Sequence, residues 1–367
     1  MNYGLNKKTR IKYYEIMRIL AIALVIFNHL PGYTLYMETT GPVQWFYMVI
    51  SMITRVNVPI FFMISGALLL KKEEDYKLVL RNRILRIIIL IVVFTTGFFL
   101  LCVLKSHVKN NTYNSSLSYL IHSLLKGDLE HAESYWFLYA YLGMLLMLPL
   151  LQRIAKGMKK IDFVVILVLH FLTSSLIPMI NACILLADGN TISLSGNFAV
   201  PLGTGKAFFY PLIGYYLDQC IDIEKISTKT IGKLIIAALT GIMVSCGFTY
   251  IEGIRNGTFT QNYVQLFDYV SAIVVFIIVK KYMTAKEKAA DPAEHKRFDI
   301  SFIGTLTLGI YLLDPYLKEI IYNPYAKIAG NVLPELLTSL IWVGISMFIG
   351  GLATFVLKKI PVIGKVL

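Results

Sequence analysis

The sequence predicts an all-α membrane protein: one domain over residues 1–367, built as a bundle of about ten transmembrane helices with both termini in the cytoplasm. Three observations predict this fold. Hydrophobic residues make up 56% of the chain and charged residues only 16%, a composition too apolar for a soluble globular protein. Apolar runs long enough to cross about 30 Å of hydrocarbon recur along the chain. Lys and Arg are unevenly shared between the segments that connect these runs.

Each apolar run is interpreted as one span. In order, the expected spans cover residues 13–31, 44–70, 84–104, 136–155, 162–181, 198–219, 231–250, 265–283, 301–321 and 334–357. The third is the clearest, because no charge falls between Ile87 and Leu101. The sixth is interrupted by Pro and Gly residues and by Lys206, so its ends are poorly defined.

The first run resembles a secretory signal in following a basic segment with Lys7, Lys8, Arg10 and Lys12. A signal peptide also needs a small-residue cleavage site, and none follows His29. We therefore expect this run to be retained as the first helix of the bundle.

Most of the 35 Lys and Arg residues lie on one side of the expected bundle: at the N-terminus, after the second, fourth, sixth and eighth spans, and after the tenth. Basic residues are retained on the cytoplasmic side, so the termini and these segments are expected there. The net charge of +13 then follows from topology and requires no nucleic-acid partner. A basic face of this kind favours anionic membrane lipids as neighbours.

The first span contains two ionisable residues, Arg18 and His29. Each such group costs at least ~2.5 kcal/mol at membrane depth, so groups of this kind mainly face a polar interior and serve a function. Their separation of eleven residues is about three helical turns, which places both on one face. One helix therefore carries a fixed cation near one end and a titratable base near the other.

The cysteines and histidines predict no metal site. The four cysteines match no zinc or redox spacing and are expected to act as small apolar residues. They are Cys102, Cys183, Cys220 and Cys246.

Six short motifs, taken in chain order, resemble acyltransferase family 3, a family of integral membrane proteins. They are Arg-x-x-Ala-x-x-x-Val-x-x-x-His from Arg18 to His29, the run Val58 to Leu69, Arg83-Ile84-Leu85-Arg86, Trp136-Phe137-Leu138-Tyr139, Gly214-Tyr215-Tyr216-Leu217 and Gly309-Ile310-Tyr311-Leu312-Leu313. The resemblance covers nearly the whole chain. It implies acyl transfer from cytoplasmic acyl-coenzyme A, usually acetyl-coenzyme A, to a hydroxyl of a glycan or other envelope molecule.

The resemblance also implies a multi-pass protein of the cell membrane of a bacterium, here in the form without an extra hydrolase-like domain. One position departs from the family pattern. Relatives usually carry His-Pro after Tyr-Leu in the ninth span, whereas this chain has Asp314-Pro315. An aspartate cannot replace a neutral imidazole donor, so the role of that histidine is not carried over to Asp314.

The resemblance and the chemistry of the side chains together assign candidate roles. His29, whose unperturbed pKa is about 6.5, is suited to take a proton from an acceptor hydroxyl. Arg83 and Arg86 share a helix face and are either ligands for coenzyme phosphates or ordinary cytoplasmic basic residues. Arg18 either binds a coenzyme phosphate or pairs with Glu15 one turn away.

The remaining candidates have supporting roles. Arg55 either stabilises the thioester oxyanion or pairs with a carboxylate such as Asp314, and the pairing is favoured. Trp136 and Tyr139 are expected to be anchors at the membrane interface. Ser65, next to Gly66, is expected at a close helix contact and not as a nucleophile.

Two other classes of function fit the same features. Ten spans and an intramembrane arginine also suit a transporter or flippase of a lipid or glycan, although the interrupted sixth span has no twin in the other half of the chain. A non-enzymatic partner of an envelope synthase is the third class. Only the enzyme predicts turnover of an acyl donor.

Overall fold

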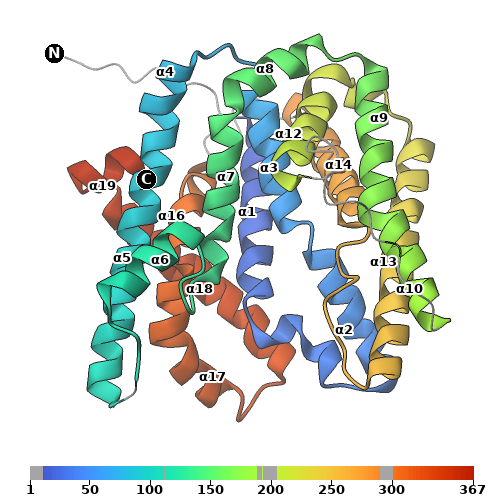
Figure 1. Cartoon of the computed structure of the whole chain (residues 1–367). Helices are drawn as coiled ribbons and strands as arrows, with labels where there is room; N and C mark the ends of the chain where they lie inside the picture. Colours follow the sequence, from blue (N-terminus) through green and yellow to red (C-terminus); the bar gives the residue numbers. More distant parts are fainter. Residues whose placement is uncertain (1–10, 111, 188–191, 193–204, 290–300) are drawn as a thin grey trace.

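The computed structural model describes residues 11–110, 112–187, 192, 205–289 and 301–367, and these residues form helices and connections without a strand. The helices are α1 (Lys12–Asn28), α2 (Gly41–Thr54), α3 (Asn57–Leu69), α4 (Tyr76–Val79), α5 (Leu85–Lys109), α6 (Leu117–Lys126), α7 (Trp136–Leu146), α8 (Leu148–Gly157), α9 (Lys160–Phe171), α10 (Ile177–Leu186), α12 (Lys206–Tyr215), α13 (Thr228–Asn256), α14 (Asp268–Ala289), α15 (Ser301–Gly304), α16 (Thr307–Leu317), α17 (Asn323–Ala329), α18 (Glu335–Leu357) and α19 (Pro361–Val366). Figure 1 shows α1 in the middle of the bundle, with α5 and α6 on one flank and α9, α10 and α13 on the other. The predicted all-helical class is confirmed for the described residues.

Fewer membrane-length helices are found than the ten expected spans. Among the described residues, five helical stretches are long and apolar enough to cross a membrane: Gly41–Leu69, which includes the break between α2 and α3, Tyr76–Lys109, Lys160–Leu185, Thr228–Asn256 and Glu335–Leu357. A sixth is obtained if Glu133–Leu146 and Leu148–Gly157, which meet at a bend of 64°, are counted as one span.

The other expected spans are shorter or more polar. Helix α12 has 10 residues, about half of what a layer of ~30 Å requires. Helix α16 continues through the turn Lys318–Tyr322 into α17, but this stretch carries Asp314, Lys318, Glu319 and Lys327. Four π-helical turns also interrupt the regular pattern, at Leu80–Ile84, Leu172–Leu176, Tyr216–Cys220 and Lys318–Tyr322. The beginning of the expected sixth span, including Pro201 and Gly203, lies outside the described residues. Ten spans and the orientation of the termini therefore stay predictions.

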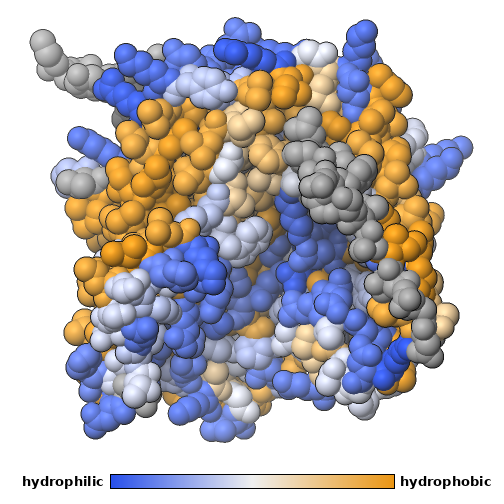
Figure 2. Space-filling model, viewed as in Figure 1, coloured by the Kyte–Doolittle hydropathy of each residue, from blue (hydrophilic) through white to orange (hydrophobic). Residues whose placement is uncertain are grey.

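The surface has the character of a membrane protein. Figure 2 shows broad apolar areas on both flanks, hydrophilic side chains along the upper and lower edges, and a hydrophilic recess in the lower half of this face. Large apolar side chains point outward from several helices, among them Val93, Ile236 and Phe348, whose side chains are exposed. Apolar exposure on this scale is expected where lipid replaces water as the solvent.

Helices α3 and α12 approach each other closely at two glycines. A Cβ atom on Gly66 would overlap the carbonyl oxygen of Pro211, and one on Gly214 would overlap the carbonyl oxygen of Met63. Small residues permit such contact between helices. The contact predicted beside Ser65 therefore lies at Gly66.

The first turn of α1 is fixed by a buried carboxylate. The hydroxyls of Tyr13 and Tyr14 donate to the two oxygens of Asp218 at 2.6 and 2.7 Å, and the Lys280 ammonium lies 3.0 Å from the same carboxylate. Three elements, α1, the turn after α12 and α14, are joined in this way. The helix that carries Arg18 and His29 is thus held in place at its start.

Candidate active site

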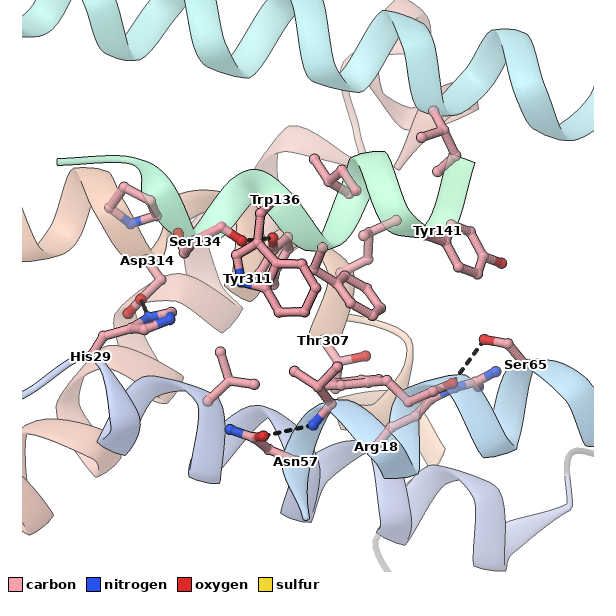
Figure 3. A pocket seen from close by; sticks show the side chains of 18 of the residues that line it. Arg18, His29, Asn57, Ser65, Ser134, Trp136, Tyr141, Thr307, Tyr311 and Asp314 are labelled. Atoms are coloured by element: carbon pink, nitrogen blue, oxygen red, sulfur yellow. Dashed lines mark hydrogen bonds and ion pairs between the residues drawn. The ribbon is translucent and has the colours of Figure 1, made fainter. Parts of the chain in front are cut away.

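A cavity of about 610 Å³ opens between α1, α3, α7 and α16. It collects side chains from five of the six motif segments; the motif Gly214–Leu217 at the end of α12 is not on its wall. Candidate residues on its wall are Arg18, His29, Arg55, Ser65, Arg83, Arg86, Trp136 and Asp314. Figure 3 shows the middle of this cavity, with α7 on one side and α1 and α3 on the other.

Helix α1 presents Arg18 and His29 to the same cavity, so the prediction that they share a face is confirmed. In Figure 3 they lie at opposite ends of the view, His29 beside Asp314 and Arg18 beside Ser65. About three turns of helix separate them, or ~16 Å along the axis. The cavity therefore has a cationic end and an imidazole end.

His29 is held by a carboxylate that sequence reasoning did not pair with it. Its Nδ1 lies 2.7 Å from Oδ2 of Asp314, and the side chains are 26% and 3% exposed. An ionised carboxylate accepts from Nδ1–H, which leaves the lone pair of a neutral imidazole on Nε2. Asp314 therefore acts as an acceptor here. The only sequence signal for it was the departure from the family's histidine at this position.

The expected pairing of Arg55 with Asp314 is wrong. Helix α2 ends at Thr54, and Arg55 lies at the break before α3 and not midway along a straight helix. Its Nη2 donates to Oε1 of Gln261, and its guanidinium lies 4.8 Å from the centre of the Tyr33 ring. Asp314 is already bound to His29.

Arg55 nevertheless lines the cavity. Its Nε is buried and has no hydrogen-bond partner among the residues that the structure describes. A buried donor without an acceptor is costly, so a partner for this nitrogen is expected from outside the described chain.

Arg18 forms the expected ion pair with Glu15 and also faces the cavity. Its Nη1 lies 2.6 Å from Oε1 of Glu15, a side chain that is only 6% exposed, whereas the Arg18 side chain is 29% exposed. Pairing with Glu15 and binding of a coenzyme phosphate, the two predicted roles of Arg18, are therefore compatible. Glu15 holds the guanidinium of a side chain that also lines the cavity.

Arg83 and Arg86 lie on the wall of the same cavity, at the start of α5. Arg83 donates from Nε and Nη2 to both oxygens of Glu74, at 3.1 and 2.8 Å. Burial raises the pKa of Glu74, but the hydrogen bonds and charge of Arg83 outweigh this effect, and the pKa lies below its ordinary value. Arg86 donates from Nε to the backbone oxygen of Val366 at 2.6 Å.

The last described residues reach this end of the cavity. Leu367 is buried and lies on the cavity wall beside the arginines. The contacts of Arg83 with Glu74 and of Arg86 with Val366 were not predicted from the sequence. Helix α19 offered no motif, and Glu74 stands among several charged residues in a connecting segment.

The remaining candidates separate into two groups. Ser65 lines the cavity and donates to the carbonyl oxygen of Phe61 at 2.8 Å. Trp136, at the start of α7, also lines the cavity. Its expected role as an anchor at the membrane interface did not include a place on the cavity wall. Tyr139 is not on the cavity wall; its hydroxyl donates to the carbonyl oxygen of Leu124 at 2.7 Å and fixes α6.

Comparison with protein families gives a match over nearly the whole chain. The model of acyltransferase family 3, described as an acyltransferase domain, matches residues 11–358. Searches among curated proteins and among solved structures gave no significant match. The matched region contains the candidate residues on the cavity wall. The chain therefore belongs to acyltransferase family 3 and is a membrane acyltransferase.

Proposed function

We propose that the protein transfers an acyl group, in the first instance acetyl, from cytoplasmic acyl-coenzyme A to a hydroxyl group of a cell-envelope glycan or a similar acceptor. We place it in the cell membrane of a bacterium. One observation carries the proposal: a single cavity joins three arginines at one end to the His29–Asp314 pair at the other.

The cationic end suits the phosphates of the donor. Guanidinium groups bind phosphate oxygens through two or more directed hydrogen bonds. Arg83 uses Nε and Nη2 for Glu74, and Arg86 uses Nε for Val366. Nη1 of Arg83 and both terminal nitrogens of Arg86 remain for a ligand, and Arg18 adds a third guanidinium deeper in the cavity.

The imidazole end suits proton transfer. In the proposed step, Nε2 of His29 takes the proton of the acceptor hydroxyl while its oxygen attacks the thioester carbon. The new C–O bond forms, the C–S bond breaks, and the departing thiolate takes the proton back from the imidazolium. Asp314 orients the ring and stabilises the imidazolium, a division of roles found in other acyl-transfer sites.

Arg55 is suited to stabilise the negative charge that develops on the thioester oxygen. A preorganised donor at such a position typically contributes a factor of about 100 to 1,000 in rate. The buried Nε without a partner in the described chain supports this role.

Turnover of acetyl-coenzyme A by the purified protein tests the proposal. Release of coenzyme A that depends on His29 supports it, because a transporter or a non-enzymatic partner has no reason to cleave the thioester. Absence of thioester cleavage by protein that still binds acetyl-coenzyme A contradicts it.

A further inference from the structure

Two asparagines lie on the cavity wall where the end of α1 meets the break between α2 and α3. Asn28 is the last residue of α1 and precedes His29, and Asn57 is the first residue of α3. We infer that Asn28 and Asn57 are positioning residues that bind the amide group of the donor nearest to its thioester. The inference rests on the proposed function, which requires the pantetheine arm of acyl-coenzyme A to reach His29.

Asn28 offers a hydrogen-bond acceptor. Its Nδ2 donates to the carbonyl oxygen of Thr54, the last residue of α2, at 3.4 Å. This contact fixes the orientation of the side-chain amide, because the Asn28 oxygen could not bond to another carbonyl oxygen. Oδ1 is buried and has no hydrogen-bond partner among the described residues. A buried acceptor in this state is costly, so a donor from outside the described chain is expected for it.

Asn57 offers the opposite group, a hydrogen-bond donor. Its Oδ1 accepts from the backbone N–H of Val58 at 2.7 Å, which fixes the side chain through its oxygen. Among the described residues, no acceptor bonds to Nδ2, although Asn57 is only 5% exposed. Figure 3 shows the amide nitrogen of Asn57 turned toward the end of the cavity at which His29 lies. Each asparagine thus uses one half of its amide on the backbone and keeps the other half for a ligand.

A secondary amide matches these two groups. Its N–H can donate to Oδ1 of Asn28, and its carbonyl oxygen can accept from Nδ2 of Asn57. The pantetheine arm contains such an amide, separated from the thioester sulfur by only two methylene groups. When the thioester carbon lies at His29, this amide must lie close by, beside the residue that precedes His29 in the chain. Val25 and Phe61, each one turn from an asparagine, offer apolar contacts to the methylene groups.

The opposite wall of the cavity is held in a fixed position. The Tyr135 hydroxyl, in the turn that leads into α7, donates to the carbonyl oxygen of Leu312 in α16 at 2.7 Å. The Tyr311 hydroxyl donates back to the carbonyl oxygen of Ser134. Figure 3 shows α7 across the cavity from Asn57. A donor arm between these walls therefore meets groups that are already in place, which favours one alignment of the thioester for attack.

The test compares acetyl-coenzyme A with an analogue in which the N–H of the amide nearest the thioester is replaced by oxygen. The analogue is an ester at this position, so it keeps a carbonyl oxygen and loses the hydrogen-bond donor. Binding of each compound to the purified protein is measured by calorimetry, and the two dissociation constants are compared. Wild-type protein should bind the amide about 10- to 100-fold more tightly, because the ester leaves a buried acceptor unpaired.

Two variants divide the effect between the asparagines. Asn28→Ala should bind both compounds with similar affinity, because the acceptor that distinguishes N–H from oxygen is gone. Asn57→Ala should weaken binding of both compounds and keep the preference for the amide, because both contain the carbonyl oxygen. Asn323→Ala is the matched control. Asn323 is exposed at the start of α17 and does not line the cavity, so both dissociation constants should stay at their wild-type values.

A purely structural role of Asn28 gives a different result. Asn28→Ala would then lower the affinity for both compounds while the preference for the amide persisted, and this outcome would overturn the inference. Equal affinity of wild-type protein for the two compounds would also overturn it, and would leave the proposed function standing if acetyl-coenzyme A is cleaved. Failure of wild-type protein to bind either compound would overturn the proposed function itself.

Discussion

His29 and Asp314 are 285 residues apart in the chain and meet at 2.7 Å between Nδ1 and Oδ2. The contact joins the end of α1 to the middle of α16. Asp314 is almost completely buried and His29 faces the cavity, so the carboxylate binds the imidazole nitrogen on the side away from the cavity. The pair has the arrangement of a base and the group that orients it.

Replacing His29 with Gln tests the base. Glutamine keeps a hydrogen-bonding amide but cannot accept a proton at neutral pH, so acyl transfer should fall by roughly 100- to 10,000-fold. Binding of acetyl-coenzyme A, measured by calorimetry, should persist. His107→Gln is the control, because His107 lies at the exposed end of α5, away from the cavity wall, and its Nδ1 bonds to the Val103 carbonyl oxygen of its own helix. If His29→Gln keeps most of the activity, the base is elsewhere.

Variants of Asp314 test the orienting role. Asn can still accept from Nδ1–H but lacks the charge that stabilises an imidazolium, whereas Ala lacks both properties. We expect kcat to fall in the order wild type, Asp314→Asn, Asp314→Ala, with a total loss of about 100-fold or more. The KM for the donor should change little. Equal kcat in Asn and Ala variants that unfold at the same temperature would argue against this role.

Arg83 and Arg86 are tested through donor affinity. Replacing either with Ala should weaken binding of acetyl-coenzyme A by about 1.5–3 kcal/mol, the typical worth of a charge-assisted hydrogen bond. Glu74→Gln is an informative companion, because it removes the charge that competes with a phosphate for Arg83 and leaves Arg83 only one neutral acceptor at this position. That variant should bind the donor at least as tightly as wild type. Unchanged affinity in the Arg83→Ala/Arg86→Ala double variant would assign both residues to structure alone.

Gly66→Ala should destabilise the bundle. The added methyl group would overlap the Pro211 carbonyl oxygen, and α3 and α12 would have to separate. Overpacking of this kind typically costs about 1–3 kcal/mol. Thermal unfolding in detergent should show a lower midpoint than for Gly143→Ala, whose added Cβ would meet nothing within 4 Å. Equal midpoints would mean that the two helices separate without cost.

Cysteine labelling tests the orientation predicted from the basic residues. Cysteines at Glu38 and Arg255 should react with an impermeant maleimide in intact cells, whereas one at Lys225 should react only after permeabilisation. The exposed native residues Cys183 and Cys220 must first be replaced. Protection of Glu38→Cys and reaction of Lys225→Cys in intact cells would reverse the assignment.

The sequence was sufficient for properties that depend on local pattern. Hydrophobicity predicts the helices, and the helical repeat predicts that Arg18 and His29 share a face, because both follow from neighbours along one chain segment. The motif around Arg83 and Arg86 also indicated residues that the fold brings to the same cavity.

Contacts that depend on packing between distant segments were not predictable in this way. The sequence favoured Asp314 as the partner of Arg55, but Arg55, at the break after Thr54, bonds to Gln261, and the end of α1 brings His29 to Asp314. The number of spans stays a prediction for a related reason. A bend such as the one of 64° between Glu133–Leu146 and Leu148–Gly157 leaves the average hydrophobicity of a run unchanged while it divides the run into shorter helices.

The hydrogen bonds of Tyr135 and Tyr311 tie the turn Glu133–Tyr135, which leads into α7, to α16, so that two walls of the cavity are joined. A carrier that exposes its site alternately to the two sides of a membrane needs parts that separate, and walls joined in this way resist that motion. Under the proposed function, the protein scaffold stays still and only the acyl group crosses the bilayer. The free energy of thioester cleavage then drives the crossing, so the modification needs neither an ion gradient nor a moving carrier.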